Sequence, residues 1–178
     1  TVQVSKVGFG IAQTLPISAD SATYLRLIGE DGDDIFNVAA DHPFTTGVEV
    51  QGGDPGASDI LNFTGTGSQL TLNLTAGSVV QSGSTPVLYS GAEVVNIDVA
   101  GANIVVEGKT AKEDFIYTPT ATDGGTLELA GTDTVFNLSN VSPTTLIIDG
   151  NGSENTLTVR GTSGADTIDV GINSIDVA

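Results

Sequence analysis

Carboxylate side chains beside glycine are the residues of this sequence best suited to chemistry. The clearest cluster lies at residues 29–34, where Asp31, Asp33 and Asp34 share one glycine-containing turn. Calcium prefers carboxylate and carbonyl oxygens and takes six to eight of them. An aspartate in a turn can instead bond to backbone N–H groups while its neighbours stay in water. A calcium site and a capped turn therefore both stay open for this cluster.

Weaker acidic clusters recur farther along the chain. Asp54 and Asp59 follow a Gly-Gly pair, and Asp166 closes a second copy of the first turn. The other candidate ligands are Asp149, Asn151 and Glu154. Together these turns predict calcium as the cofactor of the protein.

Short apolar strands must position these turns. Each turn ends in an Asp or Asn anchor, followed two places later by a large apolar residue, and this alternation points one strand face inward. The anchors are Asp34, Asp59, Asp114, Asp133, Asn155 and Asp166. Strands are expected at residues 24–28, 48–50, 70–74, 94–99, 104–106, 126–129 and 146–148. Residues 75–90, rich in Gly, Ser and Thr, are predicted to form a long loop.

Repetition of one turn and one strand predicts a solenoid. Several anchors lie roughly 20 to 25 positions apart, a normal length for one coil, so we expect about eight coils. The predicted fold is a right-handed parallel β-helix, with residues 1–178 as a single domain. An antiparallel β-sandwich, which also uses short alternating strands, is the alternative. Sandwich strands seldom resemble one another, which favours the solenoid.

Two of the turns resemble the calcium-binding nonapeptide of RTX proteins, G-G-x-G-x-D-x-U-x, in which U is a large apolar residue. The matching residues are Gly29, Gly32, Asp34 and Phe36 in one turn, and Gly161, Gly164, Asp166 and Ile168 in the other. More generally, the chain is similar to large repetitive secreted or surface proteins of bacteria that carry such turns on β-solenoids. The resemblance implies calcium binding and a secreted or cell-surface location. Whole strands separate the turns here, so calcium could be shared only between stacked coils.

Composition excludes several classes of function. The formal net charge of −17 opposes binding to nucleic acid and to anionic membranes. The absence of cysteine excludes disulfides, thiolate catalysis and cysteine-ligated metals. No apolar run is long enough to span a bilayer, so no membrane insertion is expected. The chain starts at Thr1 and has no methionine, which indicates a processed form or a piece of a longer protein and favours export.

The expected function is that of an extracellular structural or adhesive module, such as a cell-surface, matrix or fibre subunit. Stacked coils leave open strand edges, so copies of the chain or neighbouring repeats are expected to assemble end to end. A β-helix that binds or cleaves polysaccharide is one alternative, and an ice-binding threonine face is another. Arg160 is the only basic residue considered as a proton acceptor for cleavage, and Lys109 and Lys112 are expected in a loop. Few aromatic residues are present to stack on sugars, so no catalytic residue is predicted, and His42 is expected to be a solvated loop residue.

Overall fold

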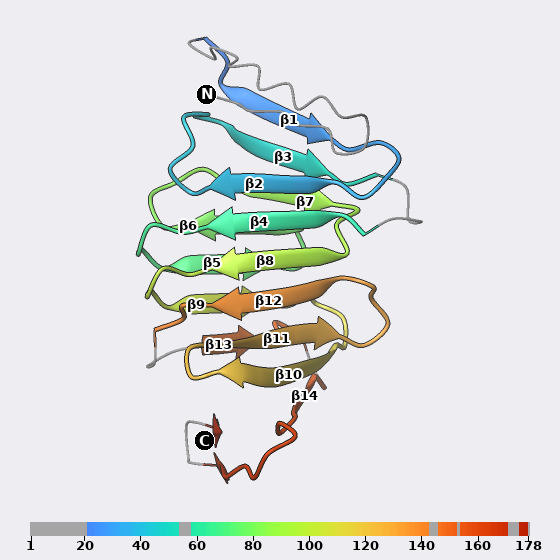
Figure 1. Cartoon of the computed structure of the whole chain (residues 1–178), viewed down its shortest axis with the longest axis vertical. Coiled ribbons are helices and arrows are strands. Elements are labelled where there is room, and N and C mark those ends of the chain that lie inside the picture. The colour runs from blue at the N-terminus through green and yellow to red at the C-terminus, as the bar shows by residue number, and fades with distance from the viewer. Residues whose placement is uncertain (1–20, 54–57, 143–145, 153, 171–174, 178) are drawn as a thin grey trace.

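The computed structural model describes residues 21–53, 58–142, 146–152, 154–170 and 175–177. Every regular element in these ranges is a β-strand, which confirms the all-β prediction. Two seven-stranded sheets overlie one another, and the strands of each stack along the long axis of the molecule (Figure 1). The predicted strands are all present.

Each sheet can be followed from the upper to the lower end of the stack in Figure 1. The first sheet contains, in spatial order, β1 (Tyr24–Ile28), β3 (Gly47–Gln51), β7 (Val87–Ser90), β6 (Ser78–Gln81), β5 (Leu70–Asn73), β9 (Ile104–Glu107) and β13 (Leu146–Asp149). The second contains β2 (Ile35–Ala39), β4 (Ile60–Thr64), β8 (Val94–Asp98), β12 (Val135–Ser139), β11 (Gly124–Leu129), β10 (Asp114–Ala121) and β14 (Thr156–Val159). A separate antiparallel pair is formed by β15 (Ile168–Val170) and β16 (Ile175–Val177).

Strands of the first sheet repeatedly pass through a corner into strands of the second. This happens from β1 to β2, β3 to β4, β7 to β8, β9 to β10 and β13 to β14. Neighbouring strands at the two ends of the stack pair in parallel. Two antiparallel meanders, β5–β6–β7 and β10–β11–β12, lie between them. Both sheets are therefore mixed rather than uniformly parallel.

The first meander corrects the prediction of a loop at residues 75–90. Four-residue strands β6 and β7 occupy this stretch, and their Val79 and Val87 are fully buried. Gly77 and Gly83 adopt positive φ angles of 59° and 86° in the turns that precede these strands. Strands this short show too little alternation to be seen in the sequence, so their pairing with neighbours decides the structure.

The anchor predicted at Asp133 is wrong by one residue. Strand β12 pairs with β8 so that Val135 lies opposite Val94. The corner position is therefore Thr134, and the buried residue that follows it is Phe136. A register shift of one residue moves every side chain to the opposite face of the strand.

The anchor predicted at Asp114 is displaced in the same way. Asp114 lies opposite Thr156 at the start of β10 and is exposed. The corner residue is the buried Glu113, and Phe115 rather than Ile116 points into the core. The strand was predicted, but its inward face was not.

Inward side chains of both sheets form one apolar core along the stack. The largest fully buried members are Phe63, Phe115, Leu61, Leu70, Leu72, Ile97, Ile104 and Leu127. At the two ends, equivalent side chains are only partly buried, namely Leu25, Leu27, Phe36, Leu146 and Ile148. The core thus runs continuously between the two sheets, and its side chains are less buried at the two ends of the stack.

Candidate functional site: the acidic corners

Three carboxylates lie one above another where β1, β3 and β7 turn into β2, β4 and β8. The backbone N–H of Asp34 donates to Asp59 Oδ1 at 2.8 Å. The backbone N–H of Asp59 donates to Glu93 Oε2 at 2.7 Å. The parallel register of β2, β4 and β8 places these residues at equivalent positions. We call Asp34, Asp59 and Glu93 the upper corner column.

Glycine makes these corners possible by leaving room for the carboxylate. A methyl group on Gly29 would lie 2.6 Å from Asp34 Oδ2, and one on Gly161 would lie 2.6 Å from Asp166 Oδ2. Neither glycine adopts a positive φ, so the need is for close approach and not for a left-handed backbone. The two turns that resemble each other in sequence therefore share their local geometry.

Burial and like charges oppose ionisation of Asp59, the middle member of the upper corner column. Asp59 has no exposed surface, and its Oδ2 is buried without a hydrogen-bond partner in the described chain. Burial raises the pKa of Asp59, and the nearby charges of Glu93, Asp34 and Asp33 add to the increase. The N–H of Asp34 acts against it. No ion pair involving a described basic residue reaches the column.

A second corner, lower in the stack, is built with one amide in place of a carboxylate. The N–H of Glu113 donates to Asn155 Oδ1 at 2.9 Å, and Asn155 Nδ2 donates to the Gly152 carbonyl at 3.2 Å. Glu113 Oε2 accepts the N–H of Lys109 at 2.6 Å. We call Glu113 and Asn155 the lower corner pair.

Some of the predicted calcium ligands come together at the upper corners. Asp33 Oδ1 accepts the N–H of Ser58 at 2.9 Å, beside Asp34 and Asp59. Asp31 is exposed in the same turn as Asp33. Asp54 lies outside the described residues.

The remaining predicted ligands lie elsewhere. Asp149 Oδ1 accepts the N–H of Asn151 at 3.0 Å at the lower end of the stack, near the exposed Glu154. Asp166 accepts a hydrogen bond from Thr162 Oγ1 at 2.9 Å, outside both large sheets. Within the described ranges, no three His, Cys, Asp or Glu side chains are grouped as metal ligands.

Sequence reasoning missed Glu93 and Glu113 as corner residues. Glu93 follows only Gly91 and Ala92 after β7, so its corner lacks the longer glycine turn. Glu113 stands next to Asp114, which fits the Asp anchor pattern better but faces solvent. The spacing Gly108 to Glu113 equals that of Gly29 to Asp34 and was the available signal.

An asparagine ladder, also missed, crosses the outer face of the second sheet. Asn62 Nδ2 donates to Asn37 Oδ1 at 2.9 Å, Asn96 to Asn62 at 2.7 Å and Asn137 to Asn96 at 2.8 Å. Thr126 Oγ1 ends the ladder by donating to Asn137 at 3.2 Å. The sequence signal is an Asn between apolar residues in four strands, at 35–38, 60–63, 94–97 and 135–138. The outward row that repeats on these strands is thus asparagine and not threonine.

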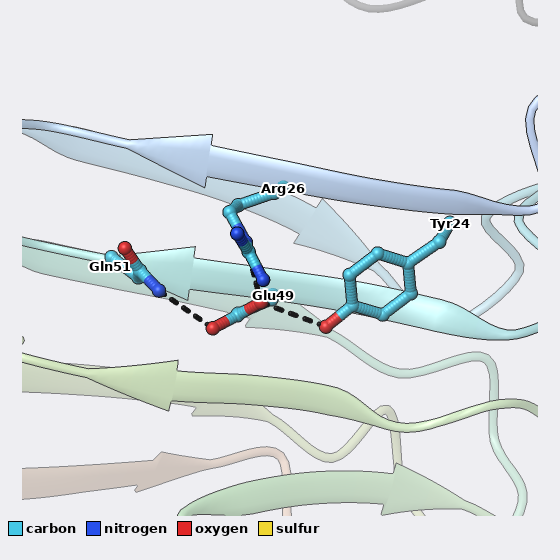
Figure 2. Close-up of polar contacts among 4 residues, drawn as sticks. All are labelled: Tyr24, Arg26, Glu49 and Gln51. Carbon is cyan, nitrogen blue, oxygen red and sulfur yellow. Dashed lines mark hydrogen bonds and ion pairs between the residues drawn. The ribbon is translucent and has the colours of Figure 1, made fainter.

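Glu49 joins β1 to β3 on the outer face of the first sheet (Figure 2). It accepts hydrogen bonds from Tyr24 Oη at 2.9 Å, Arg26 Nε at 2.8 Å and Gln51 Nε2 at 2.7 Å. These bonds, led by the one from Gln51, lower the pKa of Glu49. The cluster holds the uppermost strand of the first sheet in place.

His42 is more buried than predicted. Its ring lies against Phe44 with centroids 6.0 Å apart, and both ring nitrogens are buried without a described partner. Burial lowers the pKa of His42. The expected solvated loop residue is therefore half-buried and held neutral near pH 7.

A hollow beside β7 and β12 is small for a ligand site. Its volume is about 110 Å³, and Leu74, Tyr89, Lys109 and Phe136 are among its lining residues. Pockets for small molecules typically measure about 300–1,000 Å³. The acidic corners and the asparagine ladder are accordingly the better candidates for function.

Comparisons with known proteins give no relative for this chain. No protein-family model, no curated protein and no solved structure matches it. In the described ranges there is also no helix with the length and apolar character needed to cross a bilayer.

Proposed function

We propose that the chain is an extracellular structural or adhesive module, a right-handed β-solenoid whose coils are interrupted by two antiparallel meanders. The observation that supports this is the stacking of like residues upon like. Corner carboxylates bond from strand to strand, and so do asparagines. Such contacts hold strands in register along one axis, as a solenoid rod requires. The role is mechanical, at the cell surface or in a secreted matrix, and no catalytic residue is assigned.

Calcium is the proposed ligand of the upper corner column. Asp34 and Asp59 each have a carboxylate oxygen buried without a described partner, and both carry negative charge in one column. A divalent cation would offset that charge, with backbone carbonyls and water completing its six to eight oxygens. Bound calcium would then stiffen the corners that link the two sheets.

Thermal unfolding tests the calcium proposal. Calcium should raise the unfolding midpoint of the unaltered protein above its value in chelator, and Asp59→Asn should abolish this difference. Asp166→Asn, which alters a similar turn outside both sheets, is the matched control and should keep it. An unchanged midpoint with and without calcium in all three proteins would remove calcium from the proposal and leave the structural role.

An assay for polysaccharide cleavage tests the proposal that the role is structural and not catalytic. Lys109 and Lys112 precede β10, whereas the N–H of Arg160 bonds to Tyr117 O farther along β10. The two lysines therefore lie at a different position along that strand from Arg160. We expect neither reducing nor unsaturated ends from acidic or neutral polysaccharides. Release of either product would contradict a purely structural module.

A further inference from the structure

Both ends of the stack carry the same unit in the same orientation. The upper end is β1, a corner and β2, and the lower end is β13, a corner and β14. Between them, each sheet changes strand direction twice, through β6 in the first sheet and β11 in the second. Consequently β13 runs parallel to β1, and β14 runs parallel to β2. One copy could extend both sheets of another copy without reversing any strand.

Corner hydrogen bonds leave donors at the lower end and acceptors at the upper end. Within the stack, the N–H groups of Asp34, Asp59 and Glu113 each donate to the side chain of the next lower corner. The N–H of Glu93 instead donates upward, to the Asp59 carbonyl at 3.1 Å. Asn155 is the last corner of the stack, and its own N–H has no partner among the described residues. Asp34 is the first corner, and its carboxylate accepts no hydrogen bond there, with Oδ2 buried. Asp34 of a second copy could therefore accept a hydrogen bond from the Asn155 N–H of the first.

Glycine N–H groups follow the same polarity. Gly29 donates to the Gln51 carbonyl at 2.9 Å, and Gly108 donates to the Asp149 carbonyl at 2.7 Å. Gly150 stands at the equivalent place in the last corner, and its N–H has no described acceptor. At the upper end, the equivalent carbonyl is that of Ile28, which accepts no hydrogen bond from the described turns and loops.

Inward apolar side chains are left uncovered at the same two ends. Leu157 in β14 is 41% exposed, whereas Leu61, at the equivalent position inside the stack, is 0% exposed. Phe36 occupies that position in β2 and is only partly buried. Stacking two ends would remove these apolar side chains from water, which favours association.

We propose that copies of this chain associate head to tail, the β13–β14 end of one copy on the β1–β2 end of the next, with Asn155 in register with Asp34. This inference rests on the proposed structural role and names its partner as a second copy. The register places Thr158 beside Asn37, whose amide ends the asparagine ladder. Thr126 already bonds to the other end of that ladder inside the chain. Because both ends are acidic, screening of charge by salt favours the contact.

Cysteine trapping tests the register, because the chain has no cysteine of its own. Asn37→Cys and Thr158→Cys are both placed on exposed strand positions. Mixed and oxidised in 0.5 M salt, the two single variants should give disulfide-linked dimers. The chain carrying both changes should give an open ladder of oligomers on a non-reducing gel, because a head-to-tail contact need not close.

Two controls make the outcome decisive. Thr71→Cys lies on β5 inside the first sheet, so it should not cross-link with Thr158→Cys. Thr158→Cys alone should not form dimers, since head-to-tail contact keeps two copies of this residue apart. Cross-linking no greater than with Thr71→Cys, or dominant self-linking of Thr158→Cys, overturns the proposal. Circular dichroism confirms that each variant folds, and the calcium and polysaccharide tests on the single chain are unaffected by this result.

Discussion

The upper corner column and the lower corner pair solve the same structural problem with different chemistry. In both, a side-chain oxygen accepts the N–H of the corner residue above it, from Asp34 to Asp59 and from Glu113 to Asn155. Asn155 also uses its amide nitrogen to bind Gly152, whereas Asp59 keeps an oxygen without a described partner. The comparison teaches that this corner needs an acceptor and not a charge. The carboxylates of the upper column therefore exceed what the backbone requires.

The two regions also differ on the outer face of the second sheet. Asn37, Asn62 and Asn96 continue the upper corners into a ladder of amides. The equivalent positions below the lower corner pair hold Ile116 and Thr158. Like charges that repel at the upper corners are thus accompanied by a row of neutral hydrogen bonds three residues farther along each strand. We infer that the ladder offsets part of the repulsion in the column.

Substitution of the corner glycines is expected to destabilise the protein more than substitution of a ladder asparagine or a corner carboxylate. A methyl group on Gly52 would overlap the Gly91 carbonyl oxygen, which is backbone and cannot rotate away. On Gly108 it would meet the Glu113 carboxylate and lie 2.9 Å from the Gly150 carbonyl oxygen, a milder backbone contact than at Gly52. We expect Gly52→Ala to lower the free energy of unfolding by about 3 kcal/mol and Gly108→Ala by about 1 kcal/mol.

Denaturant unfolding measures both variants against Gly164→Ala. Gly164 has only Thr162 Oγ1 nearby, at 3.5 Å from the added methyl group. That control should stay within about 0.5 kcal/mol of the unaltered protein. Equal losses for Gly52→Ala and Gly108→Ala would show that the two corners are packed alike.

Substitution of a ladder asparagine should lower the free energy of unfolding by a smaller amount than Gly52→Ala. Asn96 donates to Asn62 and accepts from Asn137, so Asn96→Ala removes two bonds and leaves partly buried partners. We expect a loss of about 1–3 kcal/mol by urea unfolding. Asn37→Ala, at the exposed end of the ladder, removes one bond and should cost about 1 kcal/mol or less. Similar losses from both variants would mean that the amides act separately and not as a ladder.

Charge can be exchanged between the two corners by removing it at Asp59 and introducing it at Asn155. The pKa of Asp59 is raised in the folded protein, so its contribution to stability is present below the unfolded pKa of about 3.9 and is lost as pH rises through the folded value. Without calcium, Asp59→Asn should therefore stabilise the protein at pH 7 by roughly 0.5–1 kcal/mol. Asn155→Asp should destabilise it by a similar amount, since the new charge faces Glu113.

Thermal unfolding from pH 3 to pH 8 in chelator measures how each of the two substitutions changes stability. Asp59→Asn should flatten the loss of stability above pH 4, and Asn155→Asp should steepen it. High salt should reduce both differences only in part, because it screens the partly exposed Asp34 and Glu93 more than the buried Asp59. A loss of stability at pH 7 on Asp59→Asn in chelator would mean that the carboxylate has a structural role that an amide cannot fill.

The smallest effect is expected at Glu49, on the opposite face from the ladder. Its pKa is lowered, so its contribution is present above the unfolded pKa of about 4.3 and is lost as pH falls through the folded value. This is the reverse of the behaviour of Asp59. Glu49→Gln should speed hydrogen exchange of β1 amides at pH 7 and leave β9 unchanged. Tyr24→Phe, which removes one of three bonds, should have a weaker effect on the same amides.

Local patterns in the sequence were sufficient for the strands and for part of the candidate site. Alternation within residues 24–28 and 146–148 predicted β1 and β13, and the glycine turns predicted Asp34 and Asp59 as corners. Short strands such as β6 were missed because their pairing and not their composition defines them. The asparagine ladder was hidden by unequal spacing, since its bonded residues lie 25, 34 and 41 positions apart.

An all-β chain and glycine corners at the ends of strands could be predicted from the sequence alone, because these features depend on a few consecutive residues. The tertiary structure was needed to learn which corners stack and which strands run antiparallel. It was also needed to learn that Glu113, and not Asp114, points inward. Those choices depend on hydrogen bonds between residues far apart in the chain, and a shift of one residue in pairing reverses the face of every side chain. The negative charge of the upper corner column is likewise a property of the stack and not of any single turn.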